Sequence, residues 1–215
     1  MSLVVSNRYK YIFFHLPKNA GVTVSRMLID QEKMLKLRRI SSFFFRKFFK
    51  TKDNFYFSKK NKKLIFFKSH LPCYEFQDII DEKIFKNYVK FAVIRNPWDR
   101  MVSRYFYSKK VNNKFKEFSF DEFVNYDLEK NMHINNQYKY CTDQNNNFCL
   151  DEIIKFENLN NDFNKISLKF FNKKGMLKHF NKSDHKEYRE YYNIKIKDKI
   201  YNYCRKDIEF FEYEF

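Results

Sequence analysis

Short apolar runs that end at polar turns divide the chain into alternating strands and helices. Four of these runs predict buried strands, at Tyr11–Phe14, Leu64–Phe67, Tyr88–Ile94 and Glu152–Phe156. Apolar residues at helical spacing predict a helix after Gly21, helices over Trp98–Ser108 and Asn158–Phe171, and a helical region from His185 to Phe215. In that last region we expect core contacts from Tyr191, Tyr192, Ile200, Tyr203 and Ile208. The alternation predicts an α/β fold with a mostly parallel central sheet.

The composition predicts one globular domain over residues 1–215. The chain is 44% hydrophobic and 21% aromatic, which supplies a core despite the 32% of charged residues. The chain has only 2 glycines, so it cannot contain the multi-glycine loop that binds dinucleotides. Any phosphate-binding loop must use a single glycine. No apolar run is long enough to span a bilayer and no signal pattern opens the chain, which favours a cytoplasmic, bacterial protein.

The 4 cysteines carry no sign of a metal site or a disulfide framework. They form no CxxC pair, and no histidine pair has ligand spacing. We expect reduced thiols, with a Cys141–Cys149 bridge as the alternative.

Basic residues dominate the charge of the chain. Lysine and arginine number 43 against 26 acidic residues, which gives a formal net charge of +17 and points to an anionic partner. Residues 31–63 form a basic, aromatic-rich insertion in which twelve Lys or Arg residues oppose only Glu32 and Asp53. A biased composition throughout the chain is an equally open explanation of this charge.

All 3 prolines follow predicted strands, at Pro17, Pro72 and Pro97. In an open parallel sheet, ligands bind at the carboxyl ends of the strands, so these three segments are expected to line one cleft. In the first segment, residues 15–23, a lysine and a turn of small residues precede a helix. Backbone N–H groups at such a place favour a phosphate. The lysine precedes the glycine, so the segment is not a Walker-type ATPase loop.

The segment after the third strand is a second candidate for anion binding. Arg95 at the strand end and Ser103 two turns into the next helix can both point at one phosphate, through a forked guanidinium and a hydroxyl. Asn96 is expected to cap this helix, and Pro97 suits its first position. The alternative is that Arg95 pairs with Asp99 and that Ser103 is a surface residue.

Taken together, the two segments resemble the sulfotransferases that use 3′-phosphoadenosine 5′-phosphosulfate (PAPS), in particular the carbohydrate sulfotransferase branch. The family's PK(T/N)AGTS-like loop, which binds the 5′-phosphosulfate, reads PKNAGVT here. Its RNPxDRxxSxY segment, which binds the 3′-phosphate, reads from Arg95 to Tyr105. Similar stretches follow in the family's order at Ser69–Pro72, Lys155–Leu159 and His179–Ser183. The resemblance implies a P-loop-NTPase-like three-layer sandwich with helices on both faces of the sheet.

The resemblance also implies roles for individual residues, with no metal. His70 matches the family's catalytic histidine, and its ordinary pKa suits a general base near neutral pH. Glu75 is the alternative base. Lys18 is expected to stabilise the charge that grows on the leaving phosphate. The expected nucleotide-binding residues are Lys18, Asn19, Ala20, Gly21, Val22, Thr23, Arg95, Ser103, Lys182 and Ser183. Val22 departs from the family, which commonly has a hydroxyl residue there, and the remaining histidines at 133, 179 and 185 are expected to be surface or structural residues.

The implied acceptor is a hydroxyl of a carbohydrate or glycan, and adenosine 3′,5′-bisphosphate is the implied product. Residues 31–63 either shape the acceptor site, contact an anionic membrane that presents a lipid-linked glycan, or form a solvated face over an aromatic core. A P-loop-type nucleotide or sugar kinase is one alternative function, which would need Mg²⁺ and ATP but lacks the GK[ST] sequence. A basic nucleic-acid-binding module is the other, and the PAPS interpretation involves no nucleic acid.

Overall fold

The computed structural model describes most of the chain, in the ranges 3–31, 57–58, 64–67, 70–130, 136–175 and 185–215. Most of the basic 31–63 segment lies outside the described residues. So do Lys182 and Ser183, together with the histidines at positions 133 and 179.

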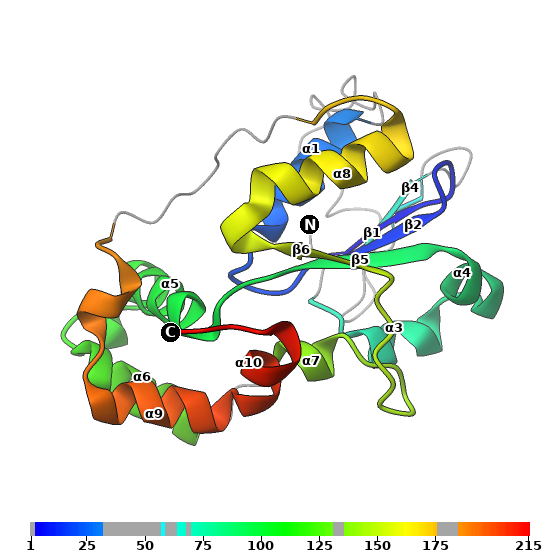
Figure 1. The fold of residues 1–215 in the computed structure, drawn as a ribbon. Coiled ribbons are helices and arrows are strands. Elements are labelled where there is room, and N and C mark those ends of the chain that lie inside the picture. The colour runs from blue at the N-terminus through cyan, green and yellow to red at the C-terminus, as the bar shows by residue number, and fades with distance from the viewer. Residues whose placement is uncertain (1–2, 32–56, 59–63, 68–69, 131–135, 176–184) are drawn as a thin grey trace.

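A six-stranded sheet with the order β3-β4-β1-β2-β5-β6 forms the centre of the fold (Figure 1). The strands are β1 (Leu3–Ser6), β2 (Tyr11–Phe14), β3 (Phe57–Ser58), β4 (Leu64–Phe67), β5 (Val89–Ile94) and β6 (Glu152–Lys155). The pairs β2–β5 and β5–β6 are parallel. Because β1 is antiparallel to both β2 and β4, strand β4 runs in the same direction as β2. The four strands expected from the sequence therefore share one direction, and the predicted α/β fold is confirmed.

Strand β1 is an element that the sequence analysis missed. It lies between β4 and β2 and pairs with β2 from Leu3 opposite Phe14 to Ser6 opposite Tyr11. All of its residues are buried, so it belongs to the core of the sheet. The sequence analysis assigned no element here, although this run is as long as the strand predicted at Tyr11–Phe14.

Side chains alternate along the strands, so each face of the sheet has its own core. One face lies under α1 (Gly21–Gln31) and α8 (Leu159–Phe171), and its buried residues include Val4, Tyr11, Phe13, Val24, Leu28, Phe91, Val93 and Phe163. The other face packs against α3 (Cys73–Ile79) and α4 (Glu82–Asn87), and its buried residues include Leu3, Val5, Ile12, Phe14, Phe76, Phe85 and Ala92. Helices therefore cover both faces of the sheet, which gives a three-layer sandwich (Figure 1).

A third core joins helices beyond the carboxyl end of β5. These helices include α5 (Pro97–Val111), α6 (Phe120–Glu129), α9 (Ile194–Tyr203) and α10 (Arg205–Phe211), while the short α7 (Gln137–Tyr140) contacts α10. The expected core residues Ile200 and Ile208 are buried there, and Tyr191 and Tyr192 pack against it half-buried. None of the described helices is both long enough and apolar enough to cross a lipid bilayer.

The expectation for Tyr203 was wrong. This side chain is 37% exposed at the last residue of α9. Ile196, Ile200 and Cys204 are buried and follow one another at intervals of four residues. This spacing places Cys204, rather than Tyr203, on the inward stripe of the helix.

All 4 cysteines are free thiols, including both members of the alternative bridge. The Cys149 thiol donates to the carbonyl oxygen of Cys141 at 3.1 Å. Burial raises the pKa of Cys73 and that of Cys141 well above the ordinary value, so both thiols are protonated at neutral pH. Within the described ranges, no cluster of His, Cys, Asp or Glu is placed to hold a metal ion.

Candidate functional site

The backbone of the loop between β2 and α1 has the alternating conformation that turns successive N–H groups toward one point. Lys18 and Ala20 have left-handed φ angles of 67° and 54°, and the intervening Asn19 does not. Residues with side chains adopt this region uncommonly, so the surrounding contacts must impose it. Alternating backbone conformations of this kind form an anion-binding concavity, and the first turn of α1 adds N–H groups without helical partners.

Two buried side chains hold this loop in place. Asn19 has no exposed surface, and its Nδ2 donates to the carbonyl oxygen of Val93 and to Oε1 of Gln137, both at 2.7 Å. Arg100 is buried and donates from Nε to the carbonyl oxygen of Pro17 at 3.1 Å. The side chain of Asn19 thus faces the interior, and only its backbone is placed to meet a ligand.

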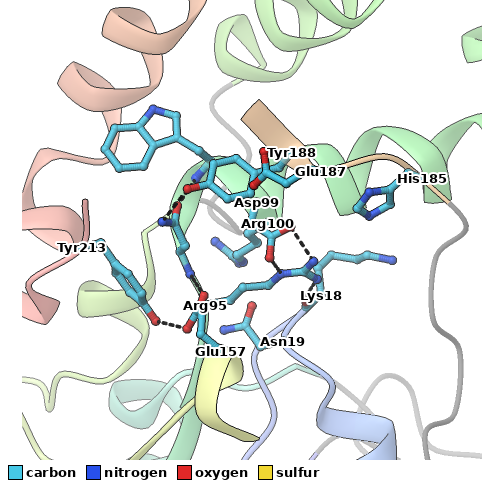
Figure 2. Close-up of polar contacts among 12 residues, drawn as sticks. Lys18, Asn19, Arg95, Asp99, Arg100, Glu157, His185, Glu187, Tyr188 and Tyr213 are labelled. Atoms are coloured by element: carbon cyan, nitrogen blue, oxygen red, sulfur yellow. Dashed lines mark hydrogen bonds and ion pairs between the residues drawn. The ribbon is translucent and has the colours of Figure 1, made fainter. Parts of the chain in front are cut away.

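Arg95 lies directly against the same loop (Figure 2). Its Nη1 donates to the carbonyl oxygen of Lys18 at 3.2 Å, while Nε and Nη2 each donate to Asp99 at 2.8 Å. The guanidinium also stacks over the ring of Phe156, 4.0 Å from its centroid. The pairing with Asp99 that the sequence left open is therefore present. Ser103 is not the surface residue of that alternative, because it is only 6% exposed.

Glu157 fixes the turn that follows Arg95. Its Oε1 accepts from the backbone N–H of Asn96 at 2.7 Å, and its Oε2 accepts from the hydroxyl of Tyr213 at 3.1 Å (Figure 2). Asn96 caps α5 as expected, since its Oδ1 accepts from the backbone N–H of Trp98 at 3.0 Å. The segment after β6 and the C-terminal residues thus set the direction in which Arg95 leaves the sheet.

Positive charge is concentrated around Lys18. The pKa of Lys18 is lowered from 10.5 to about 8. Burial is the main cause, and the positive charges of Arg95 and Arg104 contribute to the same shift. Burial likewise lowers the pKa of Arg100 to about 10. The Lys18 ammonium lies over the ring of Tyr107, 3.8 Å from its centroid. A bound anion would relieve the mutual repulsion of these cations.

His70 precedes the Leu71–Pro72 pair that leads into α3, and it contacts His15 at the start of the loop. Its Nδ1 is 2.9 Å from the carbonyl oxygen of His15, and the two imidazole rings meet edge to face at 4.7 Å. A carbonyl can only accept, so Nδ1 carries the hydrogen and the neutral ring keeps a lone pair on Nε2. The side chain is accessible to solvent, but the covered part of the ring lowers its pKa below the ordinary value, and the positive Arg100 acts in the same direction. The hydrogen bond to His15 opposes this shift.

Gly21 allows His15 to pack against the start of α1. A Cβ atom added at Gly21 would lie 1.8 Å from Cδ2 of His15, which is far inside contact distance. The single glycine of the loop is therefore needed for a close approach between side chain and backbone.

The remaining residues expected at the site differ in exposure. Thr23 is 4% exposed and Val22 is 37% exposed. The alternative base Glu75 is exposed in the first turn of α3. His185 is half-buried and its ring stacks on that of Phe106 at 5.3 Å, which agrees with the structural role expected for it.

Two residues that the sequence analysis missed join these segments. Gln137 and Asp207 are 0% and 1% exposed, respectively. Gln137 bonds to the backbone of Arg95, and Asp207 accepts from the backbone N–H of Gln137. Neither residue belongs to a recognisable motif. Each is an isolated polar residue in an aromatic-rich stretch, so the sequence did not mark it as part of the site.

Two shallow hollows in the described part of the chain are lined by neither Lys18, Arg95 nor His70. One holds about 400 Å³ beside Trp98 and Phe215, and the other about 380 Å³ beside Lys10 and Tyr88. The candidate site is thus defined by its polar contacts and its charge.

Comparison with known proteins agrees with the resemblance of the two segments. Residues 1–214 match the sulfotransferase family. A protein from Archaeoglobus fulgidus, described only as uncharacterized, is 34% identical over 101 residues, which cover 46% of this chain and 81% of that protein. No solved structure gives a significant match. Because the family match spans nearly the whole sequence, the chain belongs to the sulfotransferase family.

Proposed function

We propose that the protein transfers a sulfonyl group from PAPS to a hydroxyl of a carbohydrate or glycan. The observation that carries this proposal is the 3.2 Å contact between Arg95 and the carbonyl oxygen of Lys18. It joins the loop that resembles a 5′-phosphosulfate site to the segment that resembles a 3′-phosphate site. Membership of the sulfotransferase family supports sulfonyl transfer itself.

The loop and the cations around it fit a doubly phosphorylated donor. On the 5′ side, the N–H groups of residues 18–23 and the ammonium of Lys18 would hold the phosphosulfate. On the 3′ side, the guanidinium of Arg95 and the hydroxyl of Ser103 would hold the phosphate. Lys182 and Ser183 would close over the nucleotide from the C-terminal segment.

His70 and Lys18 would share the proton and charge transfers of the reaction. The acceptor oxygen forms a bond to sulfur while the bond between sulfur and the phosphate oxygen breaks, which releases adenosine 3′,5′-bisphosphate. His70 takes the acceptor proton on Nε2, the atom left free by the hydrogen bond from Nδ1 to His15. Lys18 and the loop N–H groups stabilise the charge on the departing phosphate. Glu75 is the alternative proton acceptor.

The proposal also covers where the protein acts and which acceptor it uses. The protein would act in the bacterial cytoplasm, and residues 31–63 would bring it to an anionic membrane that presents a lipid-linked glycan. Sedimentation with liposomes that contain anionic lipid at low salt tests the membrane contact, and a protein that stays in the supernatant contradicts it. Radiolabelled PAPS offered with a panel of glycans and small hydroxyl metabolites would identify the acceptor class.

A ligand comparison tests the donor. We expect adenosine 3′,5′-bisphosphate to raise the melting temperature in the absence of metal, because binding to the native state alone stabilises it. Stabilisation by Mg·ATP without any by adenosine 3′,5′-bisphosphate would indicate a kinase instead. Tight, salt-sensitive binding of random oligonucleotides without a response to either nucleotide would indicate a nucleic-acid-binding module.

A further inference from the structure

The side-chain amide of Gln137 contacts both proposed phosphate-binding segments at once. Its Oε1 accepts from Nδ2 of Asn19 at 2.7 Å and from the backbone N–H of Arg95 at 3.0 Å. Its Nε2 donates to the carbonyl oxygen of Arg95 at 2.8 Å. The amide thus pairs with the Arg95 backbone in both directions while it holds the loop through Asn19.

Asp207 in turn holds Gln137. Its two carboxylate oxygens accept from the backbone N–H groups of Gln137 and Tyr138, at 2.7 Å and 2.8 Å. Burial raises the pKa of Asp207, but the two N–H groups and the positive charge of Arg100 favour the ionised form. Arg100, whose charge acts on Asp207, also donates to the carbonyl oxygen of Pro17 in the loop.

These contacts are buried away from solvent, so water cannot replace them if they are lost. Asn19 and Gln137 are both 0% exposed, and Asp207 is 1% exposed. A buried amide that loses its partner finds no water to replace it, so each lost bond carries the full cost of an unsatisfied polar group. Gln137 therefore constrains the distance between the loop and the end of β5, together with the direct bond from Asn19 to the carbonyl oxygen of Val93.

We propose that Gln137, held by Asp207, is a positioning residue that sets the spacing between the Lys18 loop and Arg95 and thereby couples the binding of the donor's two phosphate groups. The inference rests on the proposed function. Gln137 acts only through Asn19 and the Arg95 backbone and contacts no ligand itself. Loss of its amide leaves the direct bonds from Asn19 to Val93 and from Arg95 to the Lys18 carbonyl oxygen, but it removes the link between the loop and the backbone of Arg95.

The test compares two ligands that differ by one phosphate, adenosine 3′,5′-bisphosphate and adenosine 5′-phosphate, by isothermal titration calorimetry at constant ionic strength. Gln137→Met keeps the length of the side chain and removes its hydrogen bonds. We expect it to weaken binding of the bisphosphate about tenfold or more, and to reduce the factor by which the 3′-phosphate improves affinity. Asp207→Asn is expected to shift the same factor in the same direction by a smaller amount.

Ser167→Ala is the matched control for lost stability. Ser167 is 0% exposed on α8, and its hydroxyl donates to the carbonyl oxygen of Lys173 at 2.7 Å. This variant also removes a buried hydrogen bond, so it should lower the melting temperature but leave the affinity ratio of the two ligands unchanged. A role limited to stability would make Gln137→Met behave in the same way.

The outcomes separate this inference from the proposed function. A folded Gln137→Met protein with the wild-type ratio overturns the positioning role while the donor assignment stands. Should Gln137→Met fail to fold, Asp207→Asn decides the question, and a wild-type ratio in that variant overturns the role. Wild-type protein that does not bind adenosine 3′,5′-bisphosphate overturns the proposed function and this inference with it.

Discussion

Nη1 of Arg95 lies 3.2 Å from the carbonyl oxygen of Lys18, across a separation of 77 positions in the sequence. The same guanidinium is held by Asp99 through two further bonds at 2.8 Å. These contacts fix the plane of the guanidinium beside the loop and leave N–H groups on both terminal nitrogens for a phosphate. An arginine held in advance loses less side-chain entropy when it binds its ligand.

Replacement of Arg95 should affect one phosphate of the donor more than the other. We expect Arg95→Ala to weaken binding of adenosine 3′,5′-bisphosphate by about 2–3 kcal/mol, because a charge-assisted contact is lost in a largely desolvated place. Binding of adenosine 5′-phosphate should change far less. Titration calorimetry with both ligands measures the difference, and an equal loss for the two would contradict the assignment of Arg95 to the 3′-phosphate.

Replacement of His70 should affect the chemical step. We expect His70→Ala to lower kcat by about 10²–10⁴-fold, since it removes the general base, while the affinity for adenosine 3′,5′-bisphosphate stays near that of the wild type. Glu75→Gln is the control, because it removes the alternative base from an exposed position on α3. Near-normal turnover by His70→Ala together with a large loss in Glu75→Gln would transfer the role to the carboxylate.

The pH profile of kcat/KM should report both groups in the free enzyme. His70 acts as a base in its neutral form, and its lowered pKa puts the acidic limb below its ordinary value of about 6.5. Lys18 acts as a cation, so activity should fall as the pH rises through its lowered pKa of about 8. Lys18→Arg keeps the charge at all accessible pH values, so the alkaline limb should move well upward in this variant. An alkaline limb that stays in place would show that another group causes it.

The sequence predicted the parts of the site that depend on local pattern. The apolar runs located the strands at whose ends Pro17, Pro72 and Pro97 stand, and the Asn96–Pro97 pair located the start of α5. The common direction of these strands was enough to bring the Lys18 loop and Arg95 to one edge of the sheet. Each of these inferences needed only residues that are neighbours along the chain.

The parts that stayed out of reach depend on pairs that are distant in sequence. The bond from Asn19 to Gln137 and the bond from Gln137 to Asp207 span 118 and 70 positions, and no periodicity marks Gln137 or Asp207. Strand β1 is a short apolar run like β2, but its place in the sheet follows from its pairing with both β2 and β4. Its register and the network around Gln137 follow from tertiary packing, which overrides local preference.

The 2 glycines of the chain offer a matched test of the contact between the loop and the histidines. A Cβ atom at Gly21 would lie 1.8 Å from the ring of His15, and one at Gly175 would lie 2.6 Å from the ring of Phe163. Either alanine variant overpacks a buried aromatic contact, and we expect each to lower the free energy of unfolding by about 1–3 kcal/mol in denaturant titrations.

Only Gly21→Ala should also lower the rate of sulfonyl transfer. The His15 ring must move to accept the new methyl group, and the same residue holds Nδ1 of His70 through its carbonyl oxygen. A displacement of the base by about 1 Å can reduce turnover by about 10²-fold. Gly175→Ala perturbs α8 and should keep kcat within a few-fold of the wild type once its folded fraction is taken into account. Equal turnover in the two variants would show that the packing of His15 on Gly21 does not position His70.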